Sequence, residues 1–124
     1  MIAVASIAGG LGAGCRYLGD RKITQATKSR FPYGTLAINL TGALLLGLMT
    51  GLSSDRIIPH DLEMVLGTGF LGGYTTFSTF VYETYFLLVR RGTRSLGLAN
   101  LSGSLIGGLL LFAAGLEAAL ALHR

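Results

Sequence analysis

Charged side chains are scarce in this sequence, and residue types that support several common functions are nearly missing. Only 13% of the 124 residues are Asp, Glu, Lys or Arg, whereas soluble domains carry about 25%. Cys15 is the single cysteine, which excludes an intrachain disulfide and a cysteine-based zinc site. There is no Walker motif, HExxH motif or Ser/His/Asp set, and the histidines are His60 in a loop and His123 in the tail. These absences argue against a soluble protein and against an enzyme.

Long hydrophobic runs take the place of the missing charge. Hydrophobic residues make up 51% of the chain, and the mean hydropathy is +0.60. A membrane-spanning helix needs about 20 apolar residues, and a helix satisfies its own backbone polar groups in lipid. We therefore expect an all-α membrane protein, a single integral membrane domain over residues 1–124. The sequence predicts four transmembrane helices at about residues 1–18, 31–54, 62–89 and 95–122.

The ten Lys and Arg residues lie almost entirely between the hydrophobic runs. Basic residues in these places are typical flanks of membrane spans that face a cytoplasm, so nucleic acid is not expected as a partner. The links at 19–30 and 90–94 hold seven of them: Arg21, Lys22, Lys28, Arg30, Arg90, Arg91 and Arg94. The opposite side holds two, Arg56 and Arg124. This imbalance predicts that both termini lie outside the cell.

Small residues indicate how the helices pack. They form a flank on the first helix and another on the fourth: Gly9, Gly10, Gly12, Ala13 and Gly14, and then Gly103, Gly107 and Gly108. In lipid such surfaces allow helix backbones to approach closely. Four thin helices enclose little space by themselves, so we expect an oligomer.

The third helix contains the most unusual segment, GFLGGYTTFSTFVYET at 69–84. Gly72 and Gly73, followed by β-branched Thr75, disfavour an unbroken helix. Non-helical backbone at mid-membrane is tolerated where it is buried in protein or lines a cavity. The sequence therefore predicts a break near mid-membrane. The freed carbonyl oxygens could bind a hard cation such as Na⁺, or the break could be a kink without an ion.

Two stripes of side chains follow that break at helical spacing. Phe77 and Phe80 lie at positions i and i+3. A polar stripe lies beside them: Thr76, Thr79 and Glu83. Phenylalanines at this spacing can simply pack, but the positive edges of their rings could also line an anion path. Glu83 is costly within a span and is either functional or an interface anchor. The remaining polar residues of the apolar runs predict interhelical hydrogen bonds: Asn39, Asn100, Ser102 and Ser104.

These motifs together resemble the Fluc/CrcB family of fluoride channels over nearly the whole chain. The first helix has GGLGAGCRY at 9–17, and the second has PYGTLAINLTG at 32–42. The third has GFLGGYTTFSTF at 69–80, which is the most specific of the four motifs. The fourth, NLSGSLIGG at 100–108, matches least, because Ile106 and Leu110 stand roughly where polar pore residues are expected.

The resemblance implies an antiparallel dimer with two fluoride pores and one central structural Na⁺. The Na⁺ ligands would be backbone carbonyls of Gly72 and Thr75 from both subunits, and Phe77 and Phe80 would be the pore phenylalanines. Asn39 would donate hydrogen bonds to the anion. The other implied pore residues are three hydroxyl donors and a carboxylate: Ser78, Thr79, Ser104 and Glu83.

The function that follows is a fluoride-selective channel in the cell membrane that passively exports fluoride and lowers its cytoplasmic concentration. The dimer partner is either a second copy or an oppositely oriented paralogue, and the charge imbalance favours the paralogue. Two other classes remain as alternatives. A proton-coupled drug exporter needs a carboxylate in its first helix, and residues 1–15 have none. A non-conducting assembly subunit would not require Asn39 with the two phenylalanines.

Overall fold

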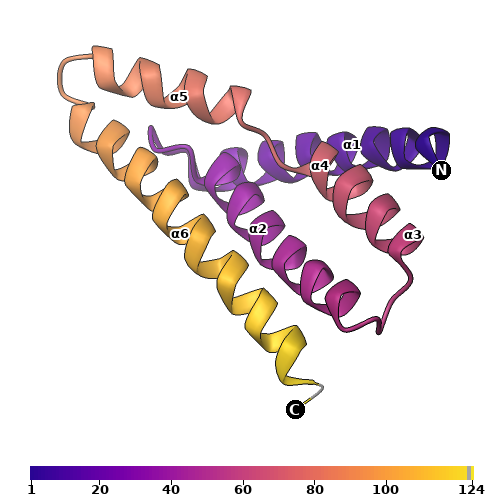
Figure 1. Ribbon diagram of the computed structural model, residues 1–124. Helices are drawn as coiled ribbons and strands as arrows, with labels where there is room; N and C mark the ends of the chain where they lie inside the picture. Colours follow the sequence, from indigo (N-terminus) through magenta and orange to yellow (C-terminus); the bar gives the residue numbers. More distant parts are fainter. Residues whose placement is uncertain (123) are drawn as a thin grey trace.

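Three long helices organise the molecule (Figure 1). The computed structural model describes residues 1–122 and 124, so His123 lies outside the described residues. Within that part of the chain every regular element is a helix and there is no strand. The long helices α1 (Ile2–Thr27), α2 (Tyr33–Ser54) and α6 (Arg94–Ala121) are each long and apolar enough to cross a membrane. The predicted all-α membrane protein is confirmed, and α2 and α6 lie within two residues of their predicted bounds.

α1 is longer than predicted. The sequence placed its end near Leu18, before a polar link, but the helix continues to Thr27. The added turns contain no proline and include four good helix formers, Arg21, Lys22, Gln25 and Ala26. The Thr24 hydroxyl donates to Asp20 one turn earlier. The helix ends where Lys28 takes a left-handed conformation, with φ 47° and ψ 36°. Part of the basic link is therefore helical, because polar residues can extend a helix beyond its apolar span.

The third predicted helix consists of several pieces. It begins as α3 (His60–Glu63) and continues through the π-helix η1 (Met64–Leu71) into α4 (Gly72–Tyr74). Thr75 is extended, with φ −82° and ψ 160°, and α5 (Ser78–Val89) follows. In Figure 1, α3 to α4 form one rod, and α5 leaves it in another direction. Residues 75–77 therefore separate two helical bodies.

The adjacent glycines are not the point where the helix ends. Gly72 has helical dihedrals, φ −61° and ψ −40°, and Gly73 belongs to α4. A Cβ built on Gly73 would lie 2.0 Å from the Gly9 carbonyl oxygen, so this glycine serves close packing against α1. The helix therefore ends at the last residue of the segment predicted to be broken, Gly72 to Thr75, because the low helix propensity of the two glycines is outweighed by packing.

Close helix contacts depend on a few particular glycines. A Cβ on Gly47 of α2 would lie 2.0 Å from the Phe112 carbonyl oxygen of α6, and a Cβ on Gly12 of α1 would lie 2.0 Å from the Phe70 carbonyl oxygen. Other glycines expected to pack have nothing within 4 Å of such a Cβ: Gly10, Gly14, Gly103 and Gly108. The prediction of close packing is confirmed for Gly12. These four glycines make no such contact within the protomer, and for them close packing against another subunit stays a prediction.

The outer surface of the protomer is strongly apolar. Ile2, Leu109 and Leu122 are 83%, 73% and 72% exposed. In water such side chains would be costly, but lipid chains are as apolar as Leu. The protein therefore fits a membrane, and exposed hydroxyls within the spans, such as those of Thr41 and Ser102, donate to carbonyls of their own helix.

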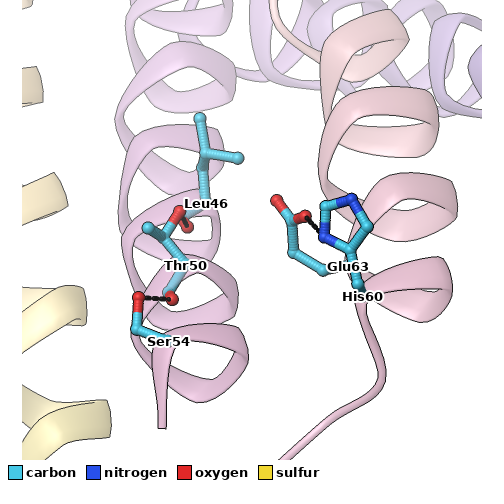
Figure 2. A network of polar contacts seen from close by, with 5 residues as sticks. All are labelled: Leu46, Thr50, Ser54, His60 and Glu63. Carbon is cyan, nitrogen blue, oxygen red and sulfur yellow. Dashed lines mark hydrogen bonds and ion pairs between the residues drawn. The ribbon is translucent and has the colours of Figure 1, made fainter. Parts of the chain in front are cut away.

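The start of the rod carries a small polar cluster (Figure 2). His60 Nδ1 lies 3.6 Å from a Glu63 carboxylate oxygen, and the His60 side chain is 75% exposed, as its predicted loop position implied. On the facing stretch of α2, the Thr50 hydroxyl donates to the Leu46 carbonyl at 2.8 Å and the Ser54 hydroxyl donates to the Thr50 carbonyl at 2.9 Å. These hydroxyls are satisfied within their own helix.

Candidate functional site

The non-helical segment between α4 and α5 is held by one side chain of α2. The Asn39 amide donates to the Thr76 carbonyl at 2.8 Å, and the Asn39 side-chain oxygen accepts from the Thr76 N–H at 2.9 Å. These two bonds satisfy the Thr76 N–H and carbonyl, which have no helical partners because Thr76 lies between α4 and α5. An Asn amide has two N–H donors, so one remains beyond this pairing. Asn39 makes the interhelical contact that its place in an apolar run predicted.

The same contacts free two backbone carbonyls. In an unbroken helix the Gly72 carbonyl would accept from the Thr76 N–H, but that N–H donates to Asn39 instead. The Thr75 carbonyl would accept from the Thr79 N–H, which donates to the Thr76 hydroxyl at 3.3 Å. Carbonyl oxygens without a donor are suitable ligands for a hard cation. The Gly72 and Thr75 carbonyls named by the family resemblance are thus among the carbonyls of this segment without a helical donor, together with those of Gly73 and Tyr74.

An open groove of about 510 Å³ passes this segment. It is lined by Asn39, Gly72 and Thr75, together with Phe77, Phe80 and Ser104. The two ring centroids are 6.0 Å apart with planes at 47°. Phe77 is 74% exposed and Phe80 is 5% exposed, so the first ring is presented outward and the second is held inside. The groove brings together six of the predicted site residues.

The remaining predicted residues lie elsewhere. Thr79 lines a smaller cavity of about 180 Å³ between α1, α2 and the start of α5, and Glu83 lines a pocket near the α5–α6 turn. Ser78 is exposed, with its hydroxyl 3.4 Å from that of Thr76. The polar stripe of α5 therefore leads away from the groove toward the basic end of the molecule.

The smaller cavity includes residues that the sequence did not single out for a site. Thr35 of α2 is buried and donates a hydrogen bond to Glu83. Asp20 of α1 lies against Gly34, and the Arg16 Nε atom is buried without a hydrogen-bond partner in the described part of the chain. Thr35 lies one helical turn before Asn39, so its polar side chain on the same face was a usable signal. Asp20 gave none, since it was assigned to a link.

The predicted interhelical bonding of α6 is present at its buried Asn. Asn100 is fully buried, and its amide donates to the Thr84 hydroxyl of α5 at 2.8 Å. The Ser104 hydroxyl donates to the Asn100 side-chain oxygen at 3.4 Å. Ser102 instead donates to the Leu98 carbonyl of its own helix. Ser104 is therefore positioned by Asn100, whereas Ser102 contributes nothing between helices.

The spanning helices, the interrupted segment and the groove define a small helical membrane protein with ion-sized polar sites and no cluster of catalytic side chains among the residues described above. Residues 3–116 match the model of the family described as "CrcB-like protein, Camphor Resistance (CrcB)". The chain belongs to this family, so the family predicted from the sequence motifs is confirmed.

Several relatives are similar over most of their length. A protein of Solibacter usitatus named "Fluoride-specific ion channel FluC" is 44% identical over 104 residues, which is 83% of this chain and 84% of the relative. "Fluoride-specific ion channel FluC 2" of Mycobacterium bovis is 46% identical over 101 residues, 82% of this chain and 76% of the relative. "Fluoride-specific ion channel FluC 1" of Leifsonia xyli is 44% identical over 116 residues, 94% and 82% respectively.

Proposed function

We propose that this protein is a fluoride-selective channel that passively exports fluoride from the cytoplasm across the cell membrane. The observation that carries this conclusion is the similarity, at 44–46% identity over most of the chain, to proteins named as fluoride-specific ion channels. The protein is therefore a channel and not an enzyme. Export lowers the intracellular fluoride concentration.

The groove provides the chemistry that fluoride needs. Fluoride is small and strongly hydrated, so donors must replace its water. The free Asn39 N–H is a neutral donor, and ring edges of Phe77 and Phe80 add weak positive potential. In this proposal the Ser104 hydroxyl turns from the Asn100 oxygen to donate to the ion. Without a Lys or Arg side chain in this lining, an ion can bind and still leave, as conduction requires. Along α5, Ser78, Thr79 and Glu83 extend the proposed path.

The working channel in this proposal is an antiparallel dimer with one structural Na⁺ at its centre. Two features support it. Gly72 is exposed and has nothing within 4 Å of a built Cβ, so a second subunit can approach the freed carbonyls of Gly72 and Thr75. In addition, a partner subunit that covers the groove would bury the largely exposed Phe77 ring. A bound monovalent cation would satisfy carbonyl oxygens from both subunits.

The segment from α3 to α5 crosses the membrane as the fourth span in this proposal. It spans residues 60–89 in two helical bodies, and the interruption then lies near mid-membrane. This arrangement places the two basic links on one side. The links on one side hold seven basic residues and the other side holds two, so one insertion direction is favoured. An oppositely oriented paralogue is therefore preferred over a second copy as the partner. Relatives named FluC 1 and FluC 2 are in accord with paired paralogues.

Fluoride efflux from sealed liposomes tests this function. The purified protein is reconstituted alone and, separately, with a paralogue from the same cell. We expect fluoride efflux without ATP and negligible chloride efflux, because in this proposal the dimer partner closes the open groove into a lining of neutral donors that cannot refit around a larger anion. Comparable chloride and fluoride currents would contradict selectivity. Proton-driven export of an organic cation would indicate a drug exporter, and folded protein without any flux in either preparation would indicate a non-conducting subunit.

The cation is tested separately from the flux. A crystal of the dimer grown in a heavier monovalent cation is searched for anomalous scattering at the Gly72 and Thr75 carbonyls. We expect Na⁺ to resist exchange, so that the site shows density coordinated by the carbonyls as a cation would be, without anomalous signal from the heavier cation. Density explained by water alone would remove the cation from the proposal and leave fluoride conduction standing.

A further inference from the structure

A basic pocket lies where α5 turns into α6, beside the start of α2. Its volume is about 520 Å³. Three arginines line it, Arg30 from the link before α2 and Arg90 and Arg91 from the turn after α5. The aromatic residues Tyr82 and Phe86 of α5 also line it. We call these five residues the arginine pocket.

The turn that carries two of the arginines is well defined. α5 ends at Val89, and Arg90 is extended with ψ 136°. Gly92 has φ 92°, a left-handed region that glycine enters without strain. Thr93 is buried, and its hydroxyl donates to the Leu87 carbonyl at 2.8 Å. This fixed turn keeps the Arg90 and Arg91 side chains at one end of α5.

The arginine pocket carries an excess of positive charge. The ion pairs formed by the described residues join His60 to Glu63 and Arg124 to Glu117, so the pocket arginines are not neutralised in that way. Glu83 is the carboxylate lining the pocket, and it accepts a hydrogen bond from Thr35. Three guanidinium groups against one carboxylate leave a net charge that attracts an anion.

The pocket's apolar wall indicates what kind of anion fits. Tyr82 and Phe86 are 65% and 39% exposed, and their ring centroids are 4.7 Å apart. Guanidinium groups bind phosphate oxygens in a bidentate manner, and aromatic rings at this depth contact the region between lipid headgroup and acyl chain. A phosphodiester with attached acyl chains uses both surfaces.

We propose that the arginine pocket binds the phosphate of an anionic membrane phospholipid, with the lipid chains lying along the Tyr82 and Phe86 face of α5. The pocket lies at the end of the molecule with the greater basic charge, where an anionic leaflet is expected. Basic pockets between transmembrane helices on that side are known lipid headgroup sites. The pocket shares Glu83 with the proposed fluoride path, so the test measures lipid binding directly and not fluoride flux.

Native mass spectrometry of the purified full-length protein tests the proposal. Protein is incubated with palmitoyl-oleoyl phosphatidylglycerol or with phosphatidylcholine of the same chains, and the retained lipid is measured. We expect preferential retention of phosphatidylglycerol, reduced about fivefold by Arg90→Gln and again by Arg91→Gln, as each near-surface Arg contributes a comparable amount. Arg90→Lys keeps the charge and should retain more lipid than Arg90→Gln, which controls for misfolding.

Arg94→Gln is the matched control. Arg94 is exposed and lies just beyond the turn, but it does not line the pocket, so its replacement should leave retention unchanged. Equal loss with Arg94→Gln would overturn the proposal in favour of diffuse charge attraction. Equal retention of the two lipids would also overturn it. If millimolar inorganic phosphate displaces the lipid while Tyr82→Ala has no effect, the pocket is a phosphate site and the lipid assignment is wrong.

Discussion

Asn39 replaces a missing turn of helical hydrogen bonding at the scale of a single residue. It satisfies both backbone groups of Thr76, and a buried backbone group left without a partner costs about 1–3 kcal/mol. The extended segment after α4 is therefore stable only with both contacts. Those contacts also deprive the Gly72 carbonyl of its helical donor. Fold stability and the proposed cation site thus depend on the same side chain.

Replacing Asn39 should destabilise the fold in a graded way. Asn39→Leu removes both contacts and is expected to lower the free energy of unfolding by about 2–4 kcal/mol. Asn39→Asp keeps an acceptor for the Thr76 N–H but turns an oxygen toward the Thr76 carbonyl, so it should be at least as damaging. Unfolding in detergent is followed by circular dichroism.

Thr50→Val on the same helix is the control for the Asn39 variants. The Thr50 hydroxyl bonds only within α2, to the Leu46 carbonyl, so its loss should cost under about 1 kcal/mol. A Thr50→Val loss equal to that of Asn39→Leu would show that the two contacts to Thr76 have no special role.

Phe80→Met tests whether the phenylalanine ring edges solvate fluoride. Met has similar volume and a flexible apolar side chain, so the fold should lose less than about 1.5 kcal/mol. If the ring edge stabilises the ion at the barrier by about 2.7 kcal/mol, efflux falls about 100-fold. Phe112→Met in α6, which does not line the groove, should leave efflux nearly intact. Normal efflux from folded Phe80→Met would refute the role of the ring edges, and equal loss in both variants would indicate packing.

At the scale of helices, apolar runs predict which residues lie in lipid. They do not predict the residue at which a helix ends when polar residues extend it beyond its apolar run. The bounds of α2 and α6 follow from their apolar runs, whereas α1 extends to Thr27 through a mostly polar stretch. The end of α4 depends on Asn39, which is distant in sequence. The local sequence therefore indicates irregular backbone near Thr75, but the residue at which the helix ends is fixed by the tertiary contact with Asn39.

The candidate site was predictable to a similar degree. Phe77, Phe80 and Asn39 carry distinct sequence signals and do line one groove. Thr35 was missed although it lies one turn before Asn39 on the same face, whereas Asp20 becomes notable only when α1 is placed beside α2 and α5. The different exposure of the two phenylalanines also could not be predicted, since Phe77 precedes the helix in which i and i+3 spacing applies.

Two glycines of α1 should respond to alanine with opposite signs. A Cβ on Gly12 would meet the Phe70 carbonyl at 2.0 Å, whereas nothing lies within 4 Å of one on Gly14. Gly12→Ala should therefore cost about 1–3 kcal/mol through overpacking. Gly14→Ala should stabilise the helix by up to about 1 kcal/mol. Thermal unfolding of both variants measures this, and equal effects would contradict the packing of α1 on η1 and α4.

At the scale of the whole molecule, charge and exposure together determine how the chain lies in the membrane. Apolar side chains cover the spans, and the basic residues gather in the links at 19–30 and 90–94. An antiparallel dimer of identical chains needs both insertion directions in equal amounts. The charge imbalance opposes this, because the positive-inside rule gives one direction the advantage. Whether the dimer contains two identical chains or two paralogues therefore depends on whether this chain inserts in both directions or in one.

Single cysteines on the two sides of the membrane measure that topology. Ser29→Cys and Ser54→Cys, both at exposed positions, are made separately in a Cys15→Ala background. Intact cells are treated with a membrane-impermeant maleimide. We expect Ser54→Cys to be labelled at once and Ser29→Cys only after lysis, since Ser29 lies in a basic link and Ser54 on the opposite side. Fluoride efflux should then require the paralogue. Equal labelling of both positions, with efflux from this chain alone, would instead establish dual insertion and a dimer of identical subunits.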